Sequence, residues 1–287
     1  MLRSHRTLVD VATVAAHVED AAWVLVDCRS TLGDVHEGPR RYATGHLPGA
    51  RYAHLEGDLA GPMTATSGRH PLPDPAVLAE RLGRWGIGND TQVVAYDDAG
   101  GAYAARLWWL LRWLGHEQVA VLDGGVQAWV AAGHALVAGV PELRARHFSG
   151  APLDSVWLDA TEVLELVEGD ASGLLVDARG AARFAGSEEP IDPIAGHIAG
   201  AINLPFTGNL GAEGKFLPPA ELAARYRAAL STVPPAEVVA YCGSGVTACH
   251  ALLAMEHAGL RGARLYAGSW SEWLRDPTRP LRTGATP

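Results

Sequence analysis

The chain repeats itself once, and this duplication limits its fold more than any other feature. Four pairs of short motifs recur in the same order in both halves: LVDCR and LVDAR, GHLPGA and GHIAGA, VVAYD and VVAYC, and GGVQAW and GSWSEW. The offset between partners is about 145 to 150 residues, far longer than the period of a solenoid repeat. The sequence therefore predicts two copies of one domain.

Each half alternates short β-branched runs with helix-like segments. The strand-like runs of the first half are WVLVDC, QVVAYD and QVAVLD, and the corresponding runs of the second half are GLLVDA, EVVAYC and ARLYAG. Continuous apolar strands separated by helices are typical of a parallel sheet that is covered on both faces. We predict an α/β protein with an N-terminal domain over 1–140 and a C-terminal domain over 150–287, each with a mainly parallel central sheet flanked by helices on both faces.

Composition and charge exclude several classes of function. A formal net charge of −9 over 287 residues gives no basic surface for nucleic acid or an anionic membrane. No apolar run approaches the roughly 20 residues that a membrane span needs. Three cysteines do not make a disulfide framework, and the N-terminus lacks a signal-peptide core. We expect a cytoplasmic protein with no nucleic-acid or membrane partner.

The duplication also serves as an internal control, because features kept in both halves are more often structural. A polar cluster at a strand end explains the aspartate and arginine of the two LVDxR motifs. The tryptophans that close the fourth motif pair are expected to pack in a core or between domains. These kept residues are Asp27, Arg29, Trp129, Asp177, Arg179 and Trp273.

The largest difference between the halves is Asp97 against Cys242. Both follow VVAY, at the carboxyl end of a strand, where open parallel sheets place their ligand sites. An aspartate cannot perform thiol chemistry. The first domain is therefore predicted to be catalytically inactive, and the second to carry the working site.

The loop after Cys242 reads GSGVTA and suits an activated thiol. Gly243 and Gly245 allow positive φ, so that successive N–H groups can form an anion-binding nest. A helix that begins near Val246 adds its positive end. These features favour the thiolate, which is the nucleophilic form of cysteine. The alternative is a buried structural thiol, with the glycines serving only a tight turn.

The other two cysteines are predicted to pack. Cys28 lies in a predicted strand and Cys249 on an apolar helix, where a resolving thiol is the alternative. A zinc site built from Cys242, Cys249 and His250 lacks a second ligand pair at metal-like spacing. We predict no metal.

A rival reading is a cysteine phosphatase, whose thiolate attacks a phosphorus atom held in a loop of N–H groups. That chemistry needs an arginine six positions after the cysteine, to bind the phosphoryl oxygens. The residue there is Ala248. The sequence therefore disfavours phosphoryl transfer.

Together the paired motifs and the loop CGSGVTA identify a family: the chain resembles the tandem-domain rhodanese sulfurtransferases over nearly its whole length. The family's inactive first domain, with aspartate in place of the cysteine, is similar to Asp97 here. The resemblance implies two rhodanese-like domains, with Cys242 as sulfur carrier, Ser244 as the hydroxyl beside it and His46 of GHLPGA as a catalytic partner. His46 has a counterpart in His197, so a structural role for it stays equally open.

The resemblance also implies the donor-binding residues. Arg183 is similar to the family's arginine for the donor's anionic group, and the loop residues Gly243, Gly245, Val246 and Thr247 complete the substrate site. CGSGVT resembles the 3-mercaptopyruvate enzymes, but Ile191 stands where those enzymes usually have a second arginine. Arg69, in SGRHPLP, is expected to be a solvated residue or a loop anchor, and the alternative is that it lines the interface cleft.

These implications define the expected reaction. A sulfane sulfur moves from a small anionic donor, 3-mercaptopyruvate or thiosulfate, through a Cys242 persulfide to a thiol, thioredoxin or cyanide. No cofactor is implied, because the protein itself carries the sulfur. Two alternatives stay open: a thiosulfate-specific rhodanese, and a non-enzymatic rhodanese-like module for sulfur relay or regulation.

Overall fold

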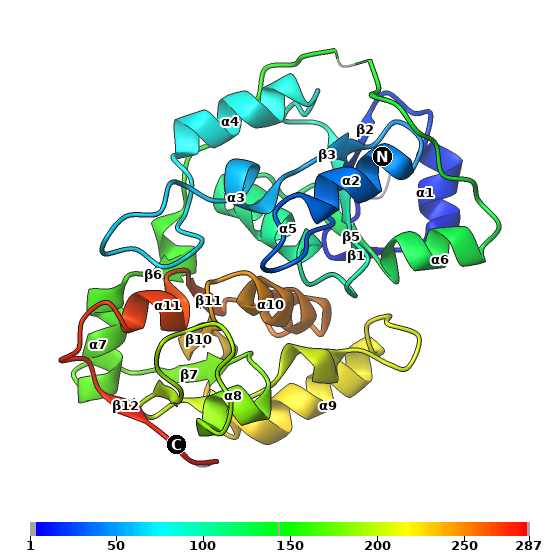
Figure 1. The fold of residues 1–287 in the computed structure, drawn as a ribbon. Helices are drawn as coiled ribbons and strands as arrows, with labels where there is room; N and C mark the ends of the chain where they lie inside the picture. Colours follow the sequence, from blue (N-terminus) through cyan, green and yellow to red (C-terminus); the bar gives the residue numbers. More distant parts are fainter. Residues whose placement is uncertain (1–3, 143, 286–287) are drawn as a thin grey trace. The chain divides into compact units, whose positions relative to one another are not determined.

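Two compact units make up the structure, a computed structural model that describes residues 4–142 and 144–285 (Figure 1). Unit 1 comprises the described parts of Met1–Gly61 and Leu72–Leu153, together with Ala212–Phe216. Unit 2 comprises Pro62–Pro71, Asp154–Gly211 and the described part of Leu217–Pro287. Each unit thus contains a short segment from the other half of the sequence.

Unit 1 is built on a five-stranded parallel sheet with the strand order β1-β5-β4-β2-β3. The apolar runs expected to form strands do so. Its elements are β1 (Leu8–Val9), α1 (Val11–His17), β2 (Trp23–Asp27), α2 (Glu37–Thr44), β3 (Arg51–Tyr52), α3 (Leu55–Asp58), α4 (Pro75–Arg84), β4 (Gln92–Tyr96), α5 (Ala104–Trp113), β5 (Val119–Leu122) and α6 (Gly125–Ala131).

The strand order determines where the helices of unit 1 lie. The chain moves toward β3 through α1 and α2, and back toward β5 through α4 and α5. Because crossovers between parallel strands are right-handed, opposite directions place the two helix pairs on opposite faces. One face carries a core in which Val14 of α1 and Trp129 of α6 pack against Leu25, Val94 and Leu122.

Unit 2 repeats this plan with the strand order β6-β11-β10-β7-β9, again entirely parallel. Its core includes Trp270 and Trp273, both fully buried. Its elements are β6 (Trp157–Leu158), α7 (Ala160–Glu168), β7 (Leu174–Asp177), α8 (Ala181–Ala185), β8 (His197–Ile198), β9 (Ile202–Asn203), α9 (Pro219–Leu230), β10 (Val238–Tyr241), α10 (Thr247–His257), β11 (Arg264–Tyr266), α11 (Ser269–Trp273) and β12 (Leu281–Arg282), which pairs with β8. The predicted α/β fold of two parallel-sheet domains is confirmed.

The motifs kept in both halves form the same structural lock in both units. Arg29 holds Asp27 with paired hydrogen bonds and donates to the carbonyl of Gly45 at 2.6 Å. Arg179 makes the same contacts with Asp177 and the carbonyl of Gly196. Each arginine therefore ties a strand end to the glycine of its GH motif, as expected of structural residues.

Each exchanged segment, Pro62–Pro71 in unit 2 and Ala212–Phe216 in unit 1, is hydrogen-bonded within or next to the fourth motif of its unit. In unit 2, the backbone N–H of Arg69 donates to Oγ of Ser271, the fourth residue of the GSWSEW motif, at 3.1 Å. In unit 1, the backbone N–H of Phe216 donates to Asp123, just before GGVQAW, at 2.9 Å. Both segments immediately precede corresponding helices, α4 and α9.

None of the helices within 4–142 and 144–285 is long and apolar enough to cross a membrane.

Candidate active site

Cys242 directly follows β10, the central strand of the unit 2 sheet, and its side chain is 2% exposed. Its backbone N–H donates to Ser269 Oγ at 3.1 Å, and its carbonyl accepts from the N–H of Trp270 at 3.0 Å. The carbonyl of Gly243 accepts from Ser271 at 3.0 Å. The start of α11 thus fixes the first residues of the cysteine loop.

The glycines of this loop are required for two different reasons. Gly245 has φ 77°, and a Cβ there would lie 2.3 Å from the carbonyl oxygen of Ala267, so backbone would have to move. Gly243 is bounded instead by arginine side chains: its Cβ would lie 2.9 Å from Nη2 of Arg69 and 3.5 Å from Nη1 of Arg183. Gly243 therefore lets the loop approach two cations, and Gly245 gives the loop its backbone conformation.

Several backbone donors of the loop are unused. In the described residues, the N–H groups of Gly243, Ser244, Val246 and Thr247 have no hydrogen-bond acceptor. Free N–H groups before a helix are the components of an anion site. Thr247, the first residue of α10, is half-buried, so this end of the helix is accessible. The loop can receive a negative charge at the cysteine.

The equivalent loop of unit 1 contains its own anion. Asp97 is fully buried, and its carboxylate accepts four backbone hydrogen bonds of 2.8 to 2.9 Å. Burial raises the pKa of Asp97, although the four donors act in the opposite direction. The donors are the N–H groups of Ala99, Gly101, Tyr103 and Ala104. The two loops therefore differ in what they hold: unit 1 a fixed carboxylate, unit 2 a thiol with free donors.

A histidine that the sequence analysis did not identify lies against the cysteine loop. Nδ1 of His70 is 2.7 Å from Oγ of Ser244, and both side chains are buried. His70 comes from the exchanged segment of unit 2. The corresponding residue in unit 1 is Phe216, whose ring lies next to Gly101 of the Asp97 loop. The predicted hydroxyl beside Cys242 thus has a titratable partner, and the inactive loop has an apolar ring instead.

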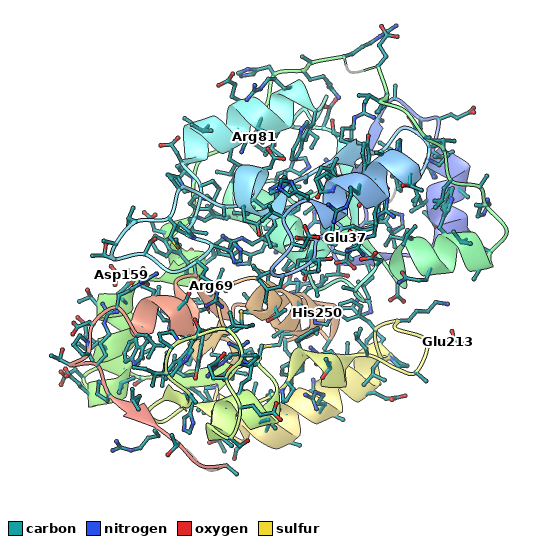
Figure 2. The ribbon with its side chains drawn as sticks, viewed as in Figure 1. Glu37, Arg69, Arg81, Asp159, Glu213 and His250 are labelled. Carbon is teal, nitrogen blue, oxygen red and sulfur yellow. The ribbon has the colours of Figure 1, made fainter. Side chains whose placement is uncertain are left out.

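Arg69 has a larger part in the site than expected for a solvated residue or a simple loop anchor. Its guanidinium pairs through Nη1 with the buried carboxylate of Asp192. Arg183 reaches the same carboxylate at 2.9 Å. Asp192 therefore bridges two arginines, and both lie beside Gly243 (Figure 2 labels Arg69).

Glu189 fixes the orientation of Arg183. Its carboxylate contacts Nε and Nη2 of Arg183 at 2.7 to 3.1 Å, and also accepts from Arg179 at 3.3 Å. Burial acts to raise the pKa of Glu189, but the hydrogen bonds from Arg183 and from the backbone of Asp192 lower it overall. Glu189 therefore remains ionised in neutral solution and holds the arginine in place.

Replacing Glu189 with glutamine tests this arrangement through pH. A carboxyl with a lowered folded-state pKa stabilises the protein above its unfolded-state value of 4.5, and this contribution is lost as the pH falls through the folded-state pKa. We expect the difference in free energy of unfolding between wild type and Glu189→Gln to be largest above pH 4.5 and to shrink below it. Urea unfolding from pH 3 to pH 7 measures it. A difference that is constant with pH would contradict the ion-pair account.

His46 and His197 have the same surroundings in their own units. The ring of His46 stacks on Tyr42 at 4.0 Å and its Nδ1 lies 2.9 Å from the Tyr42 carbonyl. The ring of His197 stacks on Phe184 at 3.7 Å, with Nδ1 2.8 Å from the Phe184 carbonyl. Both rings are buried. This shared arrangement favours the structural reading of His46, which belongs to unit 1.

The remaining candidates have supporting contacts only, and the contact of Ile191 is a backbone hydrogen bond to Glu189 Oε1 at 3.1 Å. Ile191 is 39% exposed, and its position supplies no cation. Cys28 and Cys249 are buried, and the Cys249 thiol donates to the carbonyl of Gly245 at 3.1 Å. Within the described residues, no group of three or more His, Cys, Asp or Glu side chains could hold a metal ion.

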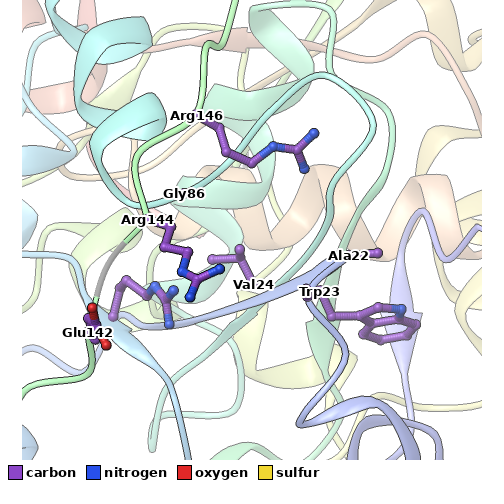
Figure 3. A pocket seen from close by; sticks show the side chains of 9 residues that line it. Ala22, Trp23, Val24, Gly86, Glu142, Arg144 and Arg146 are labelled. Carbon is purple, nitrogen blue, oxygen red and sulfur yellow. The ribbon is translucent and has the colours of Figure 1, made fainter.

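A separate cavity of about 580 Å³ lies on unit 1 (Figure 3). Its cations are already engaged in part: Arg146 pairs with Asp90 at 2.6 Å, and Arg51 donates to the carbonyl of Trp85. Among the described residues that line it, there is no cysteine, serine or histidine. It is not a candidate for covalent chemistry, and the cysteine loop of unit 2 is.

Known proteins match both halves of the chain. The family model described as "Rhodanese-like domain" matches residues 10–132 and 159–276, one stretch in each half of the chain. The "Probable 3-mercaptopyruvate sulfurtransferase" of Pseudomonas aeruginosa is 51% identical over 98% of this chain and 99% of its own length. The thiosulfate sulfurtransferase of Bos taurus is 35% identical over 90% of this chain and 84% of its own.

A solved structure gives the same result in three dimensions. The 3-mercaptopyruvate sulfurtransferase from Leishmania major superposes with a TM-score of 0.82 at 32% identity. The match covers 93% of this chain and 74% of that one. The similarity therefore extends over both units and includes proteins named for either sulfur donor.

Proposed function

Since the chain belongs to the rhodanese family and is a tandem-domain sulfurtransferase, we propose that unit 2 carries the transferred sulfur as a persulfide on Cys242. The donor is 3-mercaptopyruvate or thiosulfate, the substrates for which its relatives are named. Unit 1, with Asp97 in place of the cysteine, is catalytically inactive.

One observation carries this proposal: the cysteine loop has free N–H donors where the loop of unit 1 is filled by Asp97. A thiolate and the persulfide that replaces it are both anions, and preorganised N–H groups stabilise such a charge as an oxyanion hole does. This contrast between the loops that follow two corresponding strands, β4 and β10, supports a role for the open donors in chemistry at Cys242.

The reaction has two half-steps. The Cys242 thiolate attacks the outer sulfur of the donor, and the bond that links this sulfur to the rest of the donor breaks. Thiosulfate leaves as sulfite; mercaptopyruvate leaves as the enolate of pyruvate, which then takes up a proton. An acceptor thiol or cyanide attacks the outer sulfur of the persulfide, and the Cys242 thiolate is restored. The acceptor leaves as a persulfide or as thiocyanate.

The pair of Ser244 and His70 suits the proton step. At 2.7 Å, the imidazole fixes the direction of the hydroxyl. The hydroxyl can then donate a hydrogen bond to the bound sulfur donor or to the departing enolate, and His70 supplies the proton that the enolate takes up. His46 takes a structural role in this scheme. Arg183 binds the anionic end of the donor through the N–H groups of Nη1, since Nε and Nη2 contact Glu189 and Asp192.

The acceptor is a small thiol, thioredoxin or cyanide, and we propose a cytoplasmic setting, where such thiols stay reduced. No resident cofactor is needed in this scheme, because Cys242 itself carries the sulfur.

Donor preference is tested by measuring kcat/KM for transfer to cyanide with 3-mercaptopyruvate and with thiosulfate on the same preparation. We expect a clear preference for mercaptopyruvate, because negative charge develops on its carbonyl oxygen as the enolate forms, and the Ser244 hydroxyl can donate to this oxygen. A preference for thiosulfate would assign the enzyme to the thiosulfate-specific class. Turnover with neither donor would contradict the proposed reaction.

A further inference from the structure

We infer that Arg69 is the second arginine of the donor site, and that it forms with Arg183 a clamp for the anionic end of the sulfur donor. This inference rests on the proposed function and adds to it a specificity residue. Arg69 belongs to the exchanged segment of unit 2 and not to the part of the chain that follows Arg183, where Ile191 supplies no cation.

Each of the two guanidinium groups is held on one edge by buried carboxylates. Arg183 uses Nε and Nη2 to contact Glu189 and Asp192. Arg69 uses Nη1 to contact Asp192. Both carboxylates are almost fully buried, at 4% and 3% exposure. Both arginines are therefore locked in position before any donor binds, and little side-chain entropy is left to lose.

The remaining N–H donors of both guanidinium groups lie beside the cysteine loop. In the described residues, Nη1 of Arg183 and both Nε and Nη2 of Arg69 have no hydrogen-bond partner, and Nε of Arg69 is buried. A Cβ on Gly243 would lie 2.9 Å from the unused Nη2 of Arg69, and 3.5 Å from both the unused Nη1 and the engaged Nη2 of Arg183. The unused donors of both arginines thus face the residue next to Cys242.

Such a pair of guanidinium edges matches an anion with several oxygens. A carboxylate or the sulfonate-like end of thiosulfate can accept from both arginines at once, and charge-assisted bonds of this kind are the strong ones. The two cations are balanced by Glu189 and Asp192, so the site attracts the donor through directed N–H groups and not through excess charge. Glycine at position 243 keeps this space open.

The test compares Arg69→Met with Arg275→Met. Arg275 also comes from unit 2 and donates to the carbonyl of Ser67 in the same exchanged segment at 3.0 Å, but it is exposed and contributes no donor at Gly243. The two variants lose the same charge, and only one loses the clamp. We expect KM for the donor to rise about 10- to 100-fold in Arg69→Met, with a smaller change in kcat, and to stay near wild type in Arg275→Met.

A second readout does not depend on turnover. Sulfate, an oxyanion that reacts neither with the thiol nor with the alkylating reagent, should protect Cys242 from alkylation by neutral iodoacetamide. We expect the half-protecting sulfate concentration to rise at least about tenfold in Arg69→Met, less in Arg69→Lys, and not in Arg275→Met. An unchanged value in Arg69→Met, or an equal rise in Arg275→Met, would overturn the clamp. Wild-type inactivity with both donors would instead contradict the proposed function.

Discussion

Replacement of Cys242 by serine is expected to abolish sulfur transfer from both donors. A hydroxyl fits in the place of the thiol but cannot hold a sulfane sulfur, so the first half-step has no product. Steady-state transfer to cyanide measures the loss, which should reach the uncatalysed rate. The variant should stay folded, because the contacts that fix this residue are made by its backbone.

The matched control for this experiment is Cys249→Ser. This second thiol of unit 2 is buried on α10 and donates to the carbonyl of Gly245, a bond that a serine hydroxyl can replace. We expect it to retain turnover. Appreciable transfer by Cys242→Ser, together with loss of transfer in Cys249→Ser, would identify Cys249 as the sulfur carrier and contradict our account.

Replacement of Asp97 by alanine is expected to destabilise unit 1 by about 3 kcal/mol or more, because several buried N–H donors lose their only acceptor. The carboxylate of Asp97 fills the loop through four backbone hydrogen bonds. Differential scanning calorimetry detects the loss, and hydrogen exchange over residues 98–104 locates it in this loop.

The neighbouring Asp98→Ala is the control for charge and position. Asp98 pairs with Arg41 near the surface of unit 1, and a pair of this kind contributes about 1 kcal/mol or less. A loss in Asp97→Ala no larger than that in Asp98→Ala would show that the carboxylate does not organise the loop.

The duplicated motifs were sufficient to predict the fold. Strand runs such as QVVAY became β4, and the order of matched motifs predicted two sheets of the same topology. The same comparison separated Asp97 from Cys242, because both residues occupy one strand end and only one is a nucleophile. Local sequence carries this information, since a strand and the loop that follows it are continuous in the chain.

The partners of the cysteine loop could not be found by the same means. The contacts of His70 with Ser244, and of Arg69 with Asp192 and Ser271, join residues 174, 123 and 202 positions apart, and no periodicity relates such distant residues. A signal was nevertheless present in GRHPLP and GKFLPP, where His70 corresponds to Phe216. This is a second position at which the duplicated halves differ in chemistry.

The central claim is that Cys242 carries the sulfur, and mass analysis of the persulfide tests it most directly. The wild-type chain is incubated with donor and no acceptor, blocked under mild conditions, digested and mapped. Our account predicts the added mass of one sulfur atom on the peptide that contains Cys242, and its removal by cyanide. Sulfur on Cys28 or Cys249 instead, or an active enzyme that retains no sulfur, would contradict it.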